Sequence, residues 1–121
     1  MSYLLLIIEP TGQRVERGQE AGQAVYERML GFTAELEARG ELVASNSLAS
    51  TERAVRLQRR AGELRTLDGP FAETKEMVGG FFLLNVATRE QALAIAAQCP
   101  AAEWATVEVR QVGPCYEDAL G

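Results

Sequence analysis

The stretch Tyr3-Leu4-Leu5-Leu6-Ile7-Ile8 is a continuous apolar run that ends at Glu9-Pro10. A run of this length suits a strand buried on both faces better than a helix, which needs more residues. A second run of the same character, Gly79-Gly80-Phe81-Phe82-Leu83-Leu84-Asn85-Val86, follows a turn-rich segment. These two stretches predict the central strands of a sheet around which the rest of the chain is arranged.

A long amphipathic helix is predicted over residues 19–39, between the first strand and Gly40. Its apolar residues recur at steps of four, three and four, which places them on one stripe: Val25, Met29, Phe32 and Leu36. Such a stripe is the face that a helix packs against a core. Gly40 follows the stripe and supplies the usual glycine stop.

A second helix is predicted after the second apolar run and extends to Gln98. Thr88 with Gln91 three residues later matches a capping box, which marks a helix start. Its expected apolar stripe consists of small side chains together with one leucine: Leu93, Ala96 and Ala97. Residues 106–112 then alternate in the manner of a last strand, and residues 113–121 form a tail.

The remaining segments are expected to be loops and shorter strands. Residues 11–18 contain two glycines and alternating charges without a helical period, and predict a loop. Residues 41–48 read as a strand whose polar end, Ser45-Asn46-Ser47, can deliver hydrogen-bonding groups to a cleft. Residues 53–59 and 63–67 alternate charged with apolar side chains about a glycine-containing turn, which predicts a hairpin.

This element order predicts one domain over residues 1–121 with an α+β fold. A strand, helix, strand, strand, helix, strand order gives a ferredoxin-like βαββαβ sandwich, here with an inserted β-hairpin and both helices on one face of the sheet. The face without helices is then too apolar to stay exposed. We expect a homodimer or higher homo-oligomer to bury it. The alternative is that the hairpin folds over this face within one chain.

Composition excludes several classes of function. Seventeen acidic and twelve basic residues give a net charge of −5, which argues against a nucleic-acid or anionic-membrane partner. The first apolar run is too short for a signal peptide or membrane span, so a cytoplasmic location is expected. The chain has no histidine, so His-based metal sites and Ser-His or Cys-His nucleophiles are excluded. No metal and no cofactor are expected.

The segment from Asp68 to Glu76 concentrates special residue types more than any other. Asp68, Gly69 and Pro70 each favour a bend by a different mechanism. An aromatic ring, a hydroxyl and three charges follow within six residues: Phe71, Glu73, Thr74, Lys75 and Glu76. A plain turn needs fewer such residues, and sites often lie in loops, so this segment is the predicted functional loop.

Asp68-Gly69-Pro70-Phe71-Ala72-Glu73-Thr74-Lys75-Glu76, followed by Gly79-Gly80-Phe81, resembles the signature of the DGPF-type proteins in the YCII-related family. Tyr3 to Ile7, the Gly40 turn, Cys99-Pro100-Ala101-Ala102 and Val107-Glu108-Val109-Arg110 extend the resemblance over the chain. It implies an α+β barrel formed by a dimer, with a cleft near the loop. It also implies a genomic association with extracytoplasmic-function sigma factors.

Some YCII-like relatives pair a histidine with an aspartate as acid and base; Asp68 matches the acidic member, and this chain lacks the histidine. We expect Asp68 and Lys75 to be the catalytic residues, with Asp68 moving a proton. The expected ligand-binding residues belong to the loop and the preceding hairpin: Gly69, Pro70, Phe71, Glu73, Thr74 and Arg56. The ligand is expected to be a small anionic or oxygenated molecule.

Two other interpretations remain open alongside this small enzyme. In the first, the same cleft belongs to a non-catalytic binding or sensing module linked to sigma-factor regulation. In the second, the protein is a dimeric interaction protein, and the loop serves only the turn and the subunit interface. Cys99 and Cys115 are expected to be a small buried apolar residue and a tail residue, with redox thiols as the alternative.

Overall fold

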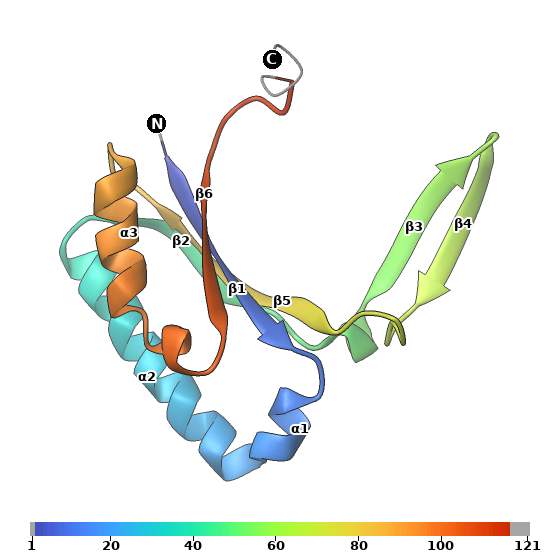
Figure 1. The fold of residues 1–121 in the computed structure, drawn as a ribbon, viewed down its shortest axis with the longest axis horizontal. Helices are drawn as coiled ribbons and strands as arrows, with labels where there is room; N and C mark the ends of the chain where they lie inside the picture. The colour runs from blue at the N-terminus through green and yellow to red at the C-terminus, as the bar shows by residue number, and fades with distance from the viewer. Residues whose placement is uncertain (1, 117–121) are drawn as a thin grey trace.

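The computed structural model describes residues 2–116 and has an α+β fold with antiparallel sheets. The main sheet has the order β2-β5-β1-β6, in which β1 (Tyr3–Pro10) and β5 (Glu76–Leu84) are central. The edge strands are β2 (Leu42–Ser47) and β6 (Thr106–Gln111). This arrangement, seen in Figure 1, is compatible with a ferredoxin-like sheet, and both predicted central strands are confirmed.

The two faces of the main sheet differ in burial. Along β1, Tyr3, Leu5, Ile7 and Glu9 are buried, whereas the residues between them are only half-buried. Because strand side chains alternate between faces, these two sets lie on opposite sides of the sheet. Within one chain, β1 is therefore buried only on the face that the helices cover. The prediction of burial on both faces is met on that face and not on the other.

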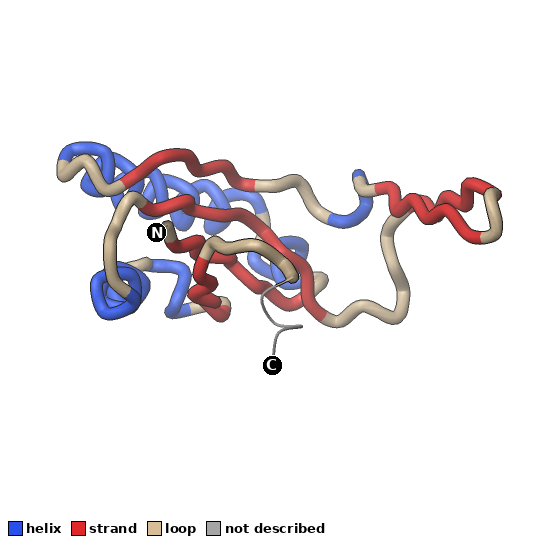
Figure 2. Tube along the Cα trace, turned by 90° about the horizontal axis from the view of Figure 1, so that it is seen from above, coloured by secondary structure: helices blue, strands red, loops and turns tan. Residues whose placement is uncertain are grey.

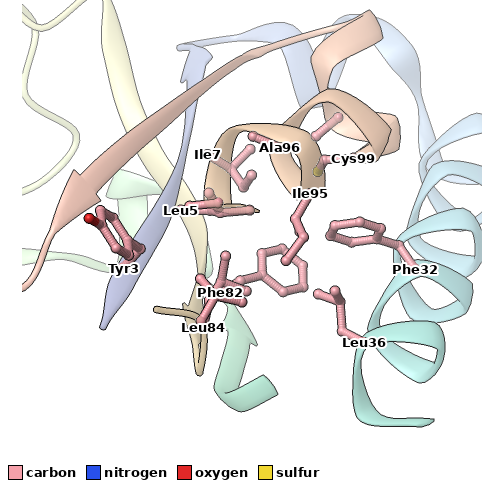
Figure 3. Close-up of a cluster of buried hydrophobic side chains, with 13 residues drawn as sticks. Tyr3, Leu5, Ile7, Phe32, Leu36, Phe82, Leu84, Ile95, Ala96 and Cys99 are labelled. Carbon is pink, nitrogen blue, oxygen red and sulfur yellow. The ribbon is translucent and has the colours of Figure 1, made fainter. Parts of the chain in front are cut away.

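Helix α2 (Gln19–Ala38) and helix α3 (Arg89–Gln98) cover the buried face and complete the core (Figure 3). The Phe32 and Phe82 rings meet edge to face, with centroids 5.2 Å apart. The capping box of Thr88 and Gln91 is present as predicted. Cys99 is buried in the same core, as expected for a small apolar residue.

The predicted apolar stripe of α3 is correct at Ala96 and wrong at Leu93 and Ala97. The helix buries Ala92, Ile95 and Ala96, while Leu93 is 42% exposed and Ala97 is also exposed. A helix turns by about 100° per residue, so a stripe through Ile95 cannot include Leu93. Ile95 and Ala96 lie three and four residues after Ala92, so these three buried residues form the stripe that packs on the core.

The predicted loop at residues 11–18 contains a short helix instead. Helix α1 (Gln13–Arg17) runs between Gly12 and Gly18, which have φ values of 87° and 82°. Five residues are too few to show a helical period. Tertiary bonds hold it: the side-chain amide of Gln13 donates to the carbonyl oxygen of Trp104 at 2.7 Å. Trp104 follows the 3₁₀ helix η2 (Pro100–Glu103).

Strands β3 (Val55–Arg60) and β4 (Glu63–Asp68) form a separate two-stranded sheet after the 3₁₀ helix η1 (Thr51–Arg53). Ala61 and Gly62 make the turn with φ values of 52° and 81°. Figures 1 and 2 show this hairpin projecting from the end of the main sheet. Every residue of both strands is exposed, so within one chain the hairpin does not cover the sheet.

None of the described helices is long and apolar enough to cross a membrane.

Candidate functional site

The predicted loop, residues 68–76, joins the hairpin to β5. Asp68 is exposed and is the last residue of β4, opposite Val55. Glu73 and Lys75 are also exposed, as is Pro70, which follows Gly69 through a cis peptide bond. The carboxylate, the ammonium group and the ring of proline therefore all face solvent in one chain.

Gly69 is required by close backbone packing. Its N–H donates to the carbonyl oxygen of Ala54 at 2.8 Å, which closes the root of the hairpin. A Cβ atom on residue 69 would overlap the carbonyl oxygen of Thr51 and lie 3.2 Å from that of Ala54. The glycine of the loop signature thus has a structural reason that does not depend on a ligand.

The structure brings together Arg56, Phe71 and Thr74 among the predicted ligand-binding residues. Phe71 is buried, and the guanidinium carbon of Arg56 lies 3.8 Å from the centroid of its ring. Arg56 and Thr74 line a small pocket of about 280 Å³ together with side chains of β1, β5 and the η1 turn: Ile8, Glu76, Met77, Val78 and Thr51. We call this the loop pocket. Asp68, Glu73 and Lys75 are not part of its lining.

Hydrogen bonds connect the end of the loop to Thr11, which directly follows β1. The backbone N–H of Thr11 donates to the carbonyl oxygen of Lys75 at 2.9 Å. The Thr11 hydroxyl lies 3.2 Å from the carbonyl oxygen of Thr74. Lys75 and Thr74 therefore contribute backbone acceptors to the fold, whatever their side chains do.

A larger groove of about 660 Å³ lies between α2 and the β2–β5 edge of the sheet, and we call it the α2–β2 groove. Its helix wall is mostly apolar and includes Val25, Tyr26, Met29, Leu30 and Thr33. Its sheet wall includes Ser45, Asn46, Ser47, Leu48 and Phe82. The groove exists because α2 is fully buried only at Phe32 and Leu36, so its first half stands off from the sheet. The prediction that Ser45–Ser47 face a cleft is confirmed.

Glu9 and Arg14 form an ion pair in the lining of this groove. Glu9 is 4% exposed, and its Oε1 lies 2.6 Å from Nη2 of Arg14. That approach is not aligned as a hydrogen bond, and Oε1 has no hydrogen-bond partner among the described residues. Arg14 also donates from Nη1 to the carbonyl oxygen of Leu48 at 2.8 Å, and its side chain is 34% exposed. The buried carboxylate is therefore charge-paired, and the partly exposed Arg14 guanidinium is the member of the pair that a ligand can reach.

Gly79 makes room for this ion pair. A Cβ atom on residue 79 would lie 2.5 Å from Oε1 of Glu9 and 2.9 Å from Nη2 of Arg14. At Gly80, a Cβ atom would lie 3.0 Å from the carbonyl oxygen of Asn46 in the neighbouring strand. The paired glycines thus permit a buried carboxylate on one side and close strand packing on the other.

One end of the groove is closed by Trp104 and its cationic neighbours. The guanidinium carbons of Arg17 and Arg28 lie 5.7 Å and 5.4 Å from the centroid of its ring. Arg28 also pairs with Glu103, and its hydrogen bonds lower the pKa of the Glu103 carboxyl and raise that of Arg28. Both side chains are exposed, and their pair lies beside Trp104.

Neither cysteine is arranged for redox chemistry or metal binding in the described part of the chain. Burial raises the pKa of the Cys99 thiol, which favours the unreactive protonated form. Cys115 is exposed, and both thiols are free. Residues 2–116 contain no group of three or more acidic, cysteine or histidine side chains placed to hold a metal ion.

The sequence predicted a functional site at the loop and did not predict one at Glu9 and Arg14. Glu9 looked like the end of a strand, and Arg14 lay in a segment predicted to be a loop. The one available signal was the pair Gly79-Gly80 inside an apolar strand, since an interior strand glycine often marks a close approach. The approaching group could not be identified without the sheet register.

The antiparallel sheets and the helices make this an α+β protein whose fold is compatible with the ferredoxin-like type, with the groove at the edge of the main sheet. The family model of the YCII-related domain matches residues 1–115, and the chain belongs to this family. It is also 44% identical over 54 residues to an uncharacterized protein of Rhizobium meliloti (strain 1021). That match covers 45% of this chain and 44% of the relative, so it spans less than half of either protein.

Proposed function

We propose that the protein binds a small anionic or oxygenated molecule in the α2–β2 groove. The observation that carries this proposal is the Arg14 guanidinium, which is 34% exposed in the lining of the groove and is paired with the buried Glu9 carboxylate. The ion pair and the bond from Arg14 to the carbonyl oxygen of Leu48 hold this guanidinium in place at the groove, where it can donate to an anionic or oxygenated ligand.

The rest of the groove supports a ligand with one polar end. Its volume of about 660 Å³ falls within the usual range for small-molecule sites. Arg14 can receive a carboxylate or phosphate oxygen, because guanidinium groups bind such anions with good geometry. Met29, Leu30 and Phe82 provide an apolar wall for the remainder of the molecule.

A thermal-shift and NMR titration with small hydroxy acids, keto acids and inorganic phosphate tests this proposal. A ligand present at one hundred times its dissociation constant stabilises the fold by about 2.7 kcal/mol. We expect Glu9→Gln and Arg14→Met to reduce binding at least tenfold. Glu20→Gln, an equal change on an exposed part of α2 outside the groove, is the matched control. Equal binding by Glu9→Gln, Arg14→Met and the control would place the ligand elsewhere.

A catalytic role for the Asp68–Glu76 loop is the second candidate function. The loop pocket, lined by Arg56 and Thr74, supports it as a place for a small anion next to the hairpin root. In this proposal Asp68 carries a proton and Lys75 or Arg56 holds the anionic group, with Gly69, Pro70, Phe71 and Glu73 shaping the site. Asp68→Asn should abolish turnover of a substrate found by screening, while Glu90→Gln, at an exposed carboxylate of α3 away from the loop, retains it. Turnover by Asp68→Asn would remove Asp68 from this role.

We also propose that two copies pack through the face of the sheet that lacks helices, forming a dimeric α+β barrel. By register, this open face carries Leu4 beside Leu83, Leu6 beside Phe81 and Ile8 beside Val78. Val78 is 41% exposed, and the others are half-buried at the surface of one chain. Contiguous apolar surface of this kind favours association.

Sedimentation of wild type and Leu6→Asp tests the dimer. A carboxylate in the middle of the open face should convert dimer to monomer, since its burial without a partner is unfavourable. Glu108, the β6 residue opposite Leu6, already places a carboxylate on this face, where it lies 3.6 Å from Arg110, so Glu108→Asp is a mild control expected to remain dimeric. A wild-type monomer at all concentrations would refute the proposal and favour a single-chain binding module.

A further inference from the structure

The hairpin of residues 55–68, which we call the arm, has one apolar face with no partner in its own chain. The register places Val55 opposite Asp68, Leu57 opposite Thr66 and Arg59 opposite Leu64. Directly opposed residues share a face, so Val55, Leu57 and Leu64 lie on one face together with Arg59, Thr66 and Asp68, and we call this the apolar face because it holds three of the four large apolar side chains of the arm. They are 56%, 62% and 58% exposed.

The other face of the arm is polar. It carries Arg56 opposite Leu67, Gln58 opposite Arg65 and Arg60 opposite Glu63. The arm is thus an amphipathic ribbon, and an amphipathic element normally buries its apolar face. An isolated two-stranded hairpin is at best marginally stable in water, so a contact along this face would stabilise the arm.

The root of the arm is held firmly although its strands are exposed. Gly69 donates to Ala54 at 2.8 Å, and Arg56 stacks on the buried ring of Phe71. These contacts set the direction in which the arm leaves the main sheet. Figures 1 and 2 show it extending beyond that sheet, away from both α2 and α3. Its apolar face is therefore available to another molecule.

The charges of the arm and of the rest of the chain are opposite. Residues 55–68 contain four arginines and two carboxylates, a net charge of +2. The remaining residues contain eight basic and fifteen acidic side chains, a net charge of −7. A basic arm is complementary to the acidic body of the same protein, and in a two-fold dimer each arm can reach the other body.

We propose that the arm clasps a second copy of this chain. Its apolar face, formed by Val55, Leu57 and Leu64, packs on the partner's body, and its arginines reduce the repulsion between two acidic bodies. This inference rests on the proposed dimer and adds a second, reciprocal contact to it. The loop pocket lies beside the proposed contacts, because Arg56 comes from the root of the arm while Ile8 and Val78 come from the open face.

Sedimentation equilibrium of arm variants of the full chain tests the clasp. We expect Leu57→Asp combined with Leu64→Asp to raise the dimer dissociation constant at least tenfold, and the milder Leu57→Ser to raise it less. Gln58→Asp, on the polar face of the arm, and Leu93→Asp, at an exposed position of α3, are matched controls. Circular dichroism should show an unchanged body in each variant, since all four positions are exposed.

The outcomes separate the clasp from the dimer itself. Loss of affinity in the arm variants but not in the two controls supports the clasp. Dissociation by Leu6→Asp with wild-type affinity in the arm variants would overturn the clasp and leave the dimer through the open face intact. A wild-type protein that is monomeric throughout would overturn both. Equal weakening by Gln58→Asp would assign the effect to charge alone and overturn the apolar contact.

Discussion

The α2–β2 groove and the Asp68–Glu76 loop are both candidate sites, but they are built in different ways. The loop gathers its special residues within nine consecutive positions, and its conspicuous glycine and aromatic residue serve packing at the hairpin root. The groove gathers Glu9, Arg14 and Ser45 from three elements and buries a carboxylate. Density of unusual residues in a sequence therefore marks backbone constraint as readily as chemistry, whereas a site can be assembled from residues that look ordinary.

The largest expected effect on the free energy of unfolding concerns Gly69 of the loop. Gly69→Ala should destabilise the fold by about 3 kcal/mol or more, because the added Cβ overlaps the rigid backbone oxygen of Thr51. Urea unfolding measures the change. Gly22→Ala is the matched control, since nothing lies within 4 Å of its Cβ position in α2, and it should be neutral or stabilising. A loss below about 1 kcal/mol at Gly69 would show that the root rearranges easily.

The next largest effect concerns the ion pair of the groove. Arg14→Met leaves the buried Glu9 carboxylate without its cation, and should cost about 2 kcal/mol of unfolding free energy. Glu9→Gln should cost less, about 1 kcal/mol, because Arg14 is partly exposed and keeps its bond to Leu48. Urea unfolding of both variants gives the order. The reverse order would mean that the carboxylate is stabilised by something other than Arg14.

A smaller effect is expected at the loop. Arg56→Ala removes the stacking on Phe71 and should cost about 0.5 to 1 kcal/mol. Arg65→Ala, on the same polar face of the arm, is the matched control and should change the unfolding free energy less. Similar costs for the two variants in chemical denaturation would argue against a specific role for the ring contact.

The smallest effect is a dependence on pH at the rim of the groove. The pKa of Glu103 is lowered in the folded protein by Arg28, so the pair stabilises the fold above the ordinary glutamate range. That contribution is lost as the pH falls, first through the ordinary glutamate range at about pH 4 and then through the lowered pKa of Glu103. In thermal melts, Glu103→Gln should lose slightly less stability than wild type as the pH falls. A steeper acid-side loss in the variant would contradict the assignment.

Much of the fold could be predicted because it depends on local pattern. The apolar runs of β1 and β5, the stripe of α2 and the capping box of Thr88 each express a rule that acts within one element. The errors arose where tertiary contacts decide. Helix α1 is too short to carry a period, and the buried stripe of α3 depends on which of its residues tertiary packing places against the core.

The sequence by itself determined the α+β class, the order of the elements, the exclusion of histidine chemistry and the turn at Asp68-Gly69-Pro70. Only the tertiary structure decided that Gly79 faces the ion pair of Glu9 and Arg14, that Arg56 lies on Phe71, and that the arm stands apart from the sheet. The physical reason is the separation along the chain over which each effect acts. Propensity and periodicity act between near neighbours in the chain, whereas close approach, ion pairing and exposure depend on residues that only folding brings together.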